Sequence, residues 1–206
     1  MTFWDFCAPF YDLAEKFNGK GYTRMLEQVS EAIPRNASVL EVAAGTGAIS
    51  IAIAGKAKSV LCTDISNKML SVARKKAKKA CISNIEFANL DIFNTGQQDA
   101  FFDVVIAGQV LHLLEEPQKA AEELQRVTKN MVILPMCLLK NLHGMTKWSV
   151  KLWRLFGFNP TTDFDLDSYT EFLPKIGFEN CDIISIPGKI PMAVALWKGG
   201  IENDSK

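Results

Sequence analysis

Short apolar runs alternate with longer amphipathic segments from residue 38 onward. Each run is rich in β-branched residues and has apolar side chains at consecutive positions, as expected for a strand that is covered on both faces. The first five predicted strands are Ser38–Ala43, Ser59–Thr63, Ile85–Ala88, Asp103–Ala107 and Met131–Pro135.

The segments between these runs have the spacing of amphipathic helices. Ser66 is placed as the N-cap of one helix, and Pro117 suits the first turn of another. One apolar face of the first helix comprises Met69, Leu70, Ala73, Ala77 and Ala80. Strand–helix alternation predicts a parallel sheet with right-handed crossovers and helices on both faces.

Two further runs, Cys181–Ile186 and Met192–Trp197, are joined by a linker too short for a parallel crossover, so they are expected to pair antiparallel. A helix is predicted near Asp167, where Ser168 and Glu171 have capping-box spacing. The fold class is therefore α/β, a doubly wound, mostly parallel seven-stranded sheet with an antiparallel last strand. We expect a single domain with an N-terminal helical cap (1–35), a cofactor-binding core (36–135), a helical insertion or lid (136–165), a closing helix and hairpin (166–198) and a tail (199–206).

Composition narrows the class of protein further. Lys plus Arg and Asp plus Glu number 23 each among 206 residues, which argues against a non-specific nucleic-acid binder. The basic helix after Ser66 is interpreted as a solvated face. The five cysteines form no C-x-x-C pair, so neither a metal site nor a disulfide framework is expected. With no basic region at the N-terminus and no long apolar run, we expect a cytoplasmic protein.

The clearest chemical signal is the turn after the first strand. In a parallel sheet, ligands bind at the carboxyl ends of the strands. There Glu41 precedes a turn containing Gly45 and Gly47, and Asp64 ends the next strand, where a carboxylate can accept hydrogen bonds from both hydroxyls of a ribose. A dinucleotide site requires a third glycine, and Ser50 stands at that position. Glu41 would repel a diphosphate but favour a cationic cofactor.

At these residues the sequence resembles the class I S-adenosylmethionine-dependent methyltransferases. Leu40–Gly47 is similar to their first motif, with Ala43 where the family usually has Gly. Asp64 matches the ribose-binding acid, Asn89–Asp91 the adenine segment, and Phe102–Gln109 the fourth motif. The resemblance implies S-adenosyl-L-methionine as cofactor, with contacts at Glu41, Ala43, Gly45, Gly47, Asp64, Ile65, Met69, Leu90, Asp91, Ala107 and Gln109.

The acceptor is expected to be a small, partly apolar molecule. His112, which follows the fourth motif, is a candidate general base, or alternatively a packed core residue. Tyr11 is a candidate to lie over the methyl group, or alternatively packs in the core. The aromatic insertion either covers an apolar acceptor, contacts a membrane surface, or packs as a static cap. Oligomeric state is left open.

Two other functions compete with methyl transfer. A non-catalytic sensor or partner subunit would keep the cofactor-binding fold without turnover. The only sequence feature that favours this function is Ala43, which stands where the family usually has Gly. A nucleotide-dependent oxidoreductase would be expected to carry Tyr-x-x-x-Lys, and none of the three tyrosines has Lys four residues later. The acceptor is not expected to be an amino group of a nucleic-acid base, because the Asn/Asp-Pro-Pro-aromatic segment typical of those enzymes is absent after the fourth strand.

Overall fold

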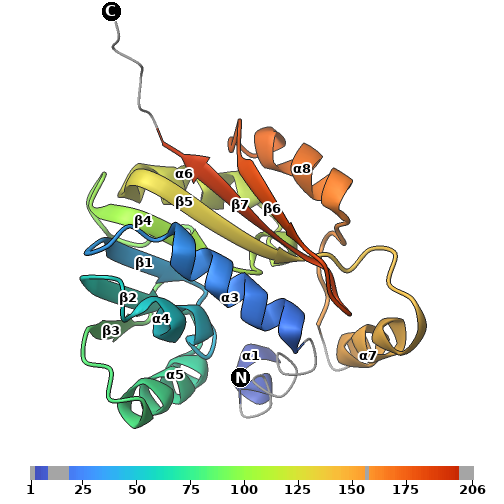
Figure 1. Cartoon of the computed structure of the whole chain (residues 1–206), viewed down its shortest axis with the longest axis horizontal. Helices are drawn as coiled ribbons and strands as arrows, with labels where there is room; N and C mark the ends of the chain where they lie inside the picture. Colours follow the sequence, from blue (N-terminus) through green and yellow to red (C-terminus); the bar gives the residue numbers. More distant parts are fainter. Residues whose placement is uncertain (1–2, 9–18, 156–157, 200–206) are drawn as a thin grey trace, which may run out of the picture.

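The computed structural model describes residues 3–8, 19–155 and 158–199 (Figure 1). The seven strands of its sheet are β1 (Ser38–Val42), β2 (Ser59–Thr63), β3 (Ile85–Ala88), β4 (Phe102–Ala107), β5 (Thr128–Cys137), β6 (Asp182–Ile186) and β7 (Met192–Lys198). They are ordered β3-β2-β1-β4-β5-β7-β6. The β7 strand runs antiparallel to both of its neighbours, as the short linker predicted.

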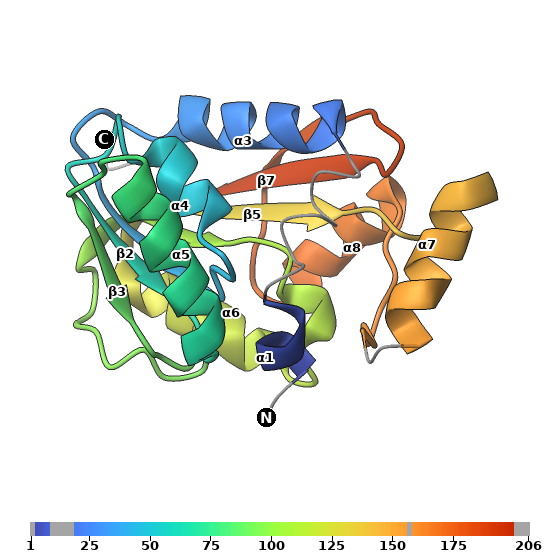
Figure 2. The same cartoon turned by 90° about the horizontal axis from the view of Figure 1, so that it is seen from below.

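The helices lie on both faces of this sheet (Figures 1 and 2). They are α1 (Phe3–Cys7), α3 (Lys20–Ala32), α4 (Ala48–Ile53), α5 (Asn67–Lys79), the 3-10 turn η1 (Leu111–Leu113), α6 (Pro117–Val127), α7 (Gly144–Leu155) and α8 (Leu166–Lys175). The doubly wound α/β class is therefore confirmed.

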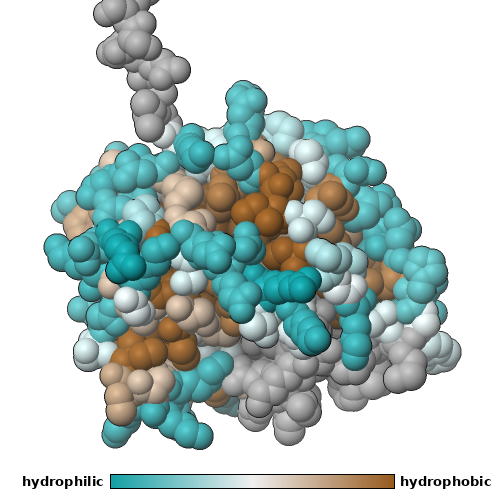
Figure 3. All heavy atoms as spheres, viewed as in Figure 1, coloured by the Kyte–Doolittle hydropathy of each residue, from teal (hydrophilic) through white to brown (hydrophobic). Residues whose placement is uncertain are grey.

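Side chains that alternate along each strand build a separate core on each face. Val39 packs into a cluster with α3, α4 and α5, whereas the next residue, Leu40, packs into a cluster with α6 and α8. The α3 helix leaves part of the β6–β7 face uncovered, and Figure 3 shows apolar side chains gathered there. The partly buried Ile184 and Leu196 lie in this region.

Several element boundaries follow directly from local chemistry. The Ser66 hydroxyl accepts the Met69 N–H at 3.2 Å, so the predicted N-cap of α5 is confirmed. The capping box of α8 was predicted one turn too late. Asp165 and Ser168 form it, because the Asp165 carboxylate accepts the Ser168 N–H at 3.0 Å and the Ser168 hydroxyl accepts the Asp165 N–H at 3.0 Å.

Candidate functional site

The turn between β1 and α4 is built from residues in left-handed conformations. Ala43, Gly45 and Gly47 have φ angles of 48°, 55° and 72°. A Cβ atom on Gly47 would stand 2.9 Å from the Cβ of Ala73 in α5. Glycine at position 47 therefore allows both the left-handed backbone and the close approach of α4 to α5, whereas Ala43 adopts such a conformation with a side chain.

Glu41 fixes the first turn of α4. Its carboxylate accepts the backbone N–H of Ser50 at 2.8 Å and also the Ser50 hydroxyl. Both residues are buried, with Glu41 2% exposed. A carboxylate that accepts N–H groups at the start of a helix is favoured by hydrogen bonding and by the helix dipole. Ser50, which replaces the third glycine of a dinucleotide motif, therefore has a structural function as a donor to Glu41.

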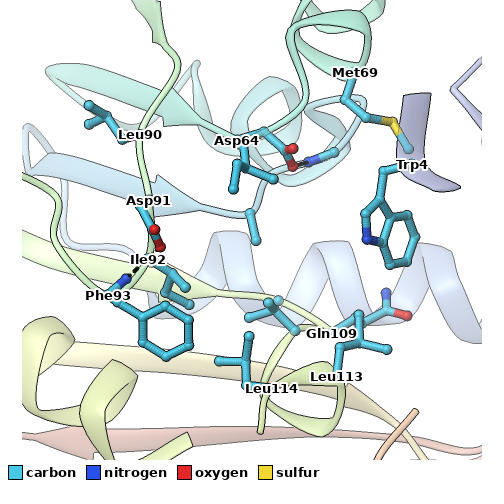
Figure 4. Close-up of a pocket in the computed structure, with 15 residues that line it drawn as sticks. Trp4, Asp64, Met69, Leu90, Asp91, Ile92, Phe93, Gln109, Leu113 and Leu114 are labelled. Atoms are coloured by element: carbon cyan, nitrogen blue, oxygen red, sulfur yellow. Dashed lines mark hydrogen bonds between the residues drawn. The ribbon is translucent and has the colours of Figure 1, made fainter. Parts of the chain in front are cut away.

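Asp64 lies at the end of β2 and faces the same turn (Figure 4). One carboxylate oxygen accepts the Gly45 N–H at 2.8 Å, and the other accepts the Ser66 N–H at 2.7 Å. Burial raises the pKa of Asp64, and these two N–H groups act to lower it. Each carboxylate oxygen can accept a further hydrogen bond, which is the requirement for holding two ribose hydroxyls.

Asn89 and Asp91 shape the wall next to Asp64. The Asn89 amide donates to the carbonyl oxygens of Asp64 and Ile65, at 2.8 Å and 2.7 Å. The Asp91 carboxylate accepts the Phe93 N–H at 3.0 Å, as a turn aspartate does, and Asp91 also lines the cavity. The side chain of Ile65 is 63% exposed and that of Phe93 is 40% exposed. Both line the cavity, so apolar surface is available there for a flat ring.

These segments enclose a cavity of about 260 Å³ (Figure 4). Eight residues predicted as cofactor contacts line it, namely Ala43, Gly45, Asp64, Ile65, Met69, Leu90, Asp91 and Gln109. Four predicted site residues are not among its lining residues: Glu41, Gly47, Ala107 and His112. Tyr11 lies outside the described residues. A mostly apolar concavity with a few fixed polar groups is typical of a small-molecule site.

Further lining residues were not predicted from the sequence. They are Trp4, Ile92, Phe93, Gly108, Val110, Leu113 and Leu114. Most of them lie within or shortly after a predicted motif, either the adenine segment or the fourth motif. Their place in the sequence beside these motifs is the feature that could have identified them. Trp4 comes from the far N-terminal segment, and only tertiary structure brings it to the cavity.

The α1 helix is held against the site by polar and aromatic contacts. The Ser66 hydroxyl donates to the Asp5 carboxylate at 2.7 Å, which joins α1 to the start of α5. The ring of Trp4 packs edge-on to Phe158, with centroids 6.5 Å apart. Trp4 lies beside Gln109 and Leu113 in Figure 4, so α1 covers one end of the cavity.

His112 is buried within η1, 4% exposed, and it is not among the residues that line the cavity, whereas the next two residues, Leu113 and Leu114, are. Its ring contacts Phe158, and its Nδ1 atom has no hydrogen-bond partner among the described residues. Burial lowers the pKa of His112 to about 4, and the nearby Asp163 opposes this decrease. The ring is therefore neutral near pH 7.

A cavity at the carboxyl ends of β1, β2 and β4, with the carboxylate of Asp64 directly after β2, is the arrangement found in proteins of the Rossmann-like methyltransferase class. The chain matches the model of the family described as "Methyltransferase domain" over residues 33–156, and it belongs to that family. The resemblance to class I methyltransferases is thus confirmed.

Two curated relatives illustrate the sequence similarity. The demethylmenaquinone methyltransferase of Paenarthrobacter aurescens (strain TC1) is 32% identical over 131 residues, which are 62% of this chain and 50% of that protein. The Bacillus subtilis (strain 168) protein YqeM is 30% identical over 194 residues, covering 93% of this chain and 72% of YqeM. The chain thus spans about half the length of the menaquinone relative.

Solved structures confirm the fold. A S-adenosylmethionine-dependent methyltransferase from Aquifex aeolicus superposes with a TM-score of 0.67 at 18% identity, covering 89% of this chain and 95% of that one. Magnesium protoporphyrin IX methyltransferase from Synechocystis PCC 6803, solved with bound S-adenosylhomocysteine, gives 0.66 at 21% identity, covering 87% and 84%.

Proposed function

We propose that this protein transfers a methyl group from S-adenosyl-L-methionine to a small, partly apolar acceptor. The observation that carries the proposal is the geometry of Asp64. Both oxygens of its carboxylate are positioned by backbone N–H groups, and the residue lines a cavity beside the exposed side chain of Ile65. Membership of the methyltransferase family and the named relatives favour an enzyme over a sensor or an oxidoreductase.

The cavity offers distinct surfaces for the parts of the cofactor. Asp64 would accept hydrogen bonds from the ribose hydroxyls, and Ile65 and Leu90 would contact the adenine, with Asp91 near its amino group. The turn at Gly45, with Ala43 beside it, allows the methionine portion to approach the backbone closely. Met69 and Gln109 complete the lining. Gly47, Ala107 and Glu41 are not among the lining residues, and their contacts with the cofactor remain predictions.

The bound cofactor supplies an activated methyl group on a sulfonium. The acceptor would take this methyl group, S-adenosylhomocysteine would be the leaving group, and any proton on the acceptor would pass to solvent or to a base such as His112. The residues of this chain therefore have to align the acceptor and exclude water. Trp4, Leu113 and Leu114 provide an apolar surface suited to a partly apolar acceptor.

His112 and Tyr11 remain the proposed catalytic side chains. Nδ1 of a neutral His112 can accept a proton, although a pKa of about 4 makes it a weak base near pH 7. Because His112 would be a weak base, the favoured acceptor is one that loses its proton readily or carries none. The curated demethylmenaquinone methyltransferases match the expectation of a small, partly apolar acceptor.

The test combines binding and turnover. Isothermal titration should show that the wild-type protein binds S-adenosylmethionine and S-adenosylhomocysteine, and that the Asp64→Ala variant loses this binding. Release of S-adenosylhomocysteine should then be measured with a series of small quinols, phenols and amines. Failure of the wild-type protein to bind the cofactor at millimolar concentration would overturn the proposal, and binding without turnover on any acceptor would favour the sensor function.

A further inference from the structure

The α7 helix carries a basic and aromatic face that the proposed reaction does not use. This α7 face comprises Lys147, Trp148, Lys151 and Arg154. With 3.6 residues per turn, these four positions fall within an arc of about 120°. Trp148 is 75% exposed, and Lys147, Lys151 and Arg154 are exposed as well.

Charge is unevenly distributed around this helix. The chain is neutral overall, yet residues 136–162 contain Lys140 and the three cations of the α7 face and no Asp or Glu. Arg154 pairs with Asp163, and Lys140 pairs with Asp165. Within the described parts of the chain, Lys147 and Lys151 form no ion pair. Two uncompensated cations therefore flank the exposed indole.

One of the two lysines lies over the indole ring of Trp148. The Nζ atom of Lys151 lies 5.8 Å from the centroid of the Trp148 ring. Figures 1 and 2 both place α7 at the opposite end of the molecule from α5, projecting from the sheet. The face is thus accessible to a large, flat partner.

We propose that the α7 face binds the surface of membranes that contain anionic lipids. Trp side chains favour the headgroup layer, where the ring is buried and the N–H stays hydrated. Lysines beside it attract lipid phosphates, and their alkyl chains can lie along the apolar boundary. Among the described residues no helix is long and apolar enough to cross a membrane. The mode of contact is peripheral, and it does not depend on the methyl-transfer proposal.

The experiment is co-sedimentation of the full chain with vesicles of phosphatidylcholine mixed with phosphatidylglycerol, beside vesicles of pure phosphatidylcholine. We expect binding to the anionic vesicles, weakened by salt because exposed charges are screened. Lys147→Glu with Lys151→Glu should lower partitioning by roughly 25-fold or more at low salt. Trp148→Ala should lower it on the order of tenfold.

A matched control uses α5, which is also basic. Lys75→Glu with Lys79→Glu makes the same change in net charge at two exposed positions on a helix that lacks tryptophan. Partitioning of this variant should remain close to that of the wild type. Equal losses in the two double variants, or wild-type binding that ignores lipid charge, would overturn the proposal. A concentration-dependent dimer that Trp148→Ala abolishes would also overturn it, because a second copy would then cover the face.

Discussion

The backbone N–H of Gly45 donates a 2.8 Å hydrogen bond to the carboxylate of Asp64. The bond joins the turn after β1 to the end of β2, across neighbouring parallel strands. The residue proposed to hold the ribose therefore also positions the turn proposed to receive the methionine portion. A change at Asp64 is expected to alter both.

Asp64→Asn should weaken binding of S-adenosylhomocysteine by about 10- to 100-fold. The substitution removes the negative charge and turns an amide NH₂ toward the N–H of Gly45 or Ser66, with a loss of about 1.5–3 kcal/mol for a charge-assisted hydrogen bond. Isothermal titration measures the effect. Asp103→Asn is the control, because Asp103 accepts the Ser38 N–H and hydroxyl at the other end of the sheet. Equal affinity in Asp64→Asn and wild type would contradict the assignment of the ribose site.

Ala43→Gly should stabilise the protein by about 0.4–1 kcal/mol. Ala43 has a φ of 48°, a conformation that costs an L-residue free energy and that glycine adopts readily. Urea denaturation of both proteins gives the difference in free energy of unfolding. The neighbouring Ala44 is not in the left-handed region, so Ala44→Gly should be destabilising instead. The same sign of effect at both positions would rule out this explanation.

Gly47→Ala should destabilise the protein by about 1–3 kcal/mol. The new Cβ would stand 2.9 Å from the Cβ of Ala73, and the backbone at φ 72° would be strained as well. Thermal unfolding, followed by circular dichroism, should show a lower melting temperature. Gly55→Ala serves as the comparison, because a Cβ there meets nothing within 4 Å. A melting temperature for Gly47→Ala as high as that of Gly55→Ala would be inconsistent with the packing of α4 on α5.

His112 should make the protein lose stability as the pH falls from about 6.5 to about 4. The folded pKa of about 4 lies below the unfolded value near 6.5, so in this window the unfolded chain binds a proton that the folded chain excludes. The contribution of His112 to the free energy of unfolding is fully present above pH 6.5, and about 3 kcal/mol of it is lost by pH 4. Denaturant unfolding at several pH values tests this. His112→Phe should flatten that part of the profile, and an unchanged slope in the variant would show that other groups cause it.

Most strands could be predicted because buried parallel strands produce short apolar runs. The β5 strand was predicted too short, as Met131–Pro135, because proline usually ends a strand. In the structure β5 pairs with β4 at Ile133 and continues beyond it beside β7, as far as Cys137. The Pro135 carbonyl still accepts the Gln109 N–H at 2.8 Å. The strand therefore passes through a proline at a point where one neighbour has already ended.

The residues of the candidate site were also predicted only in part. Gly45 and Asp64 were found because motif position at the end of a parallel strand determines which side chains meet. Glu41 was expected to face a cationic cofactor, and its observed partner is Ser50. The contact of Glu41 with the cofactor remains a prediction.

The sequence alone determined the order of strands and helices, the antiparallel hairpin and the cofactor turn, because these depend on local periodicity, linker length and spacing. Tertiary structure decided which distant groups meet. It placed Trp4 at the cavity and Asp5 on Ser66, across a separation of about sixty residues, and it buried His112 so that its pKa falls to about 4. Such contacts arise from packing between elements, and no local pattern encodes them.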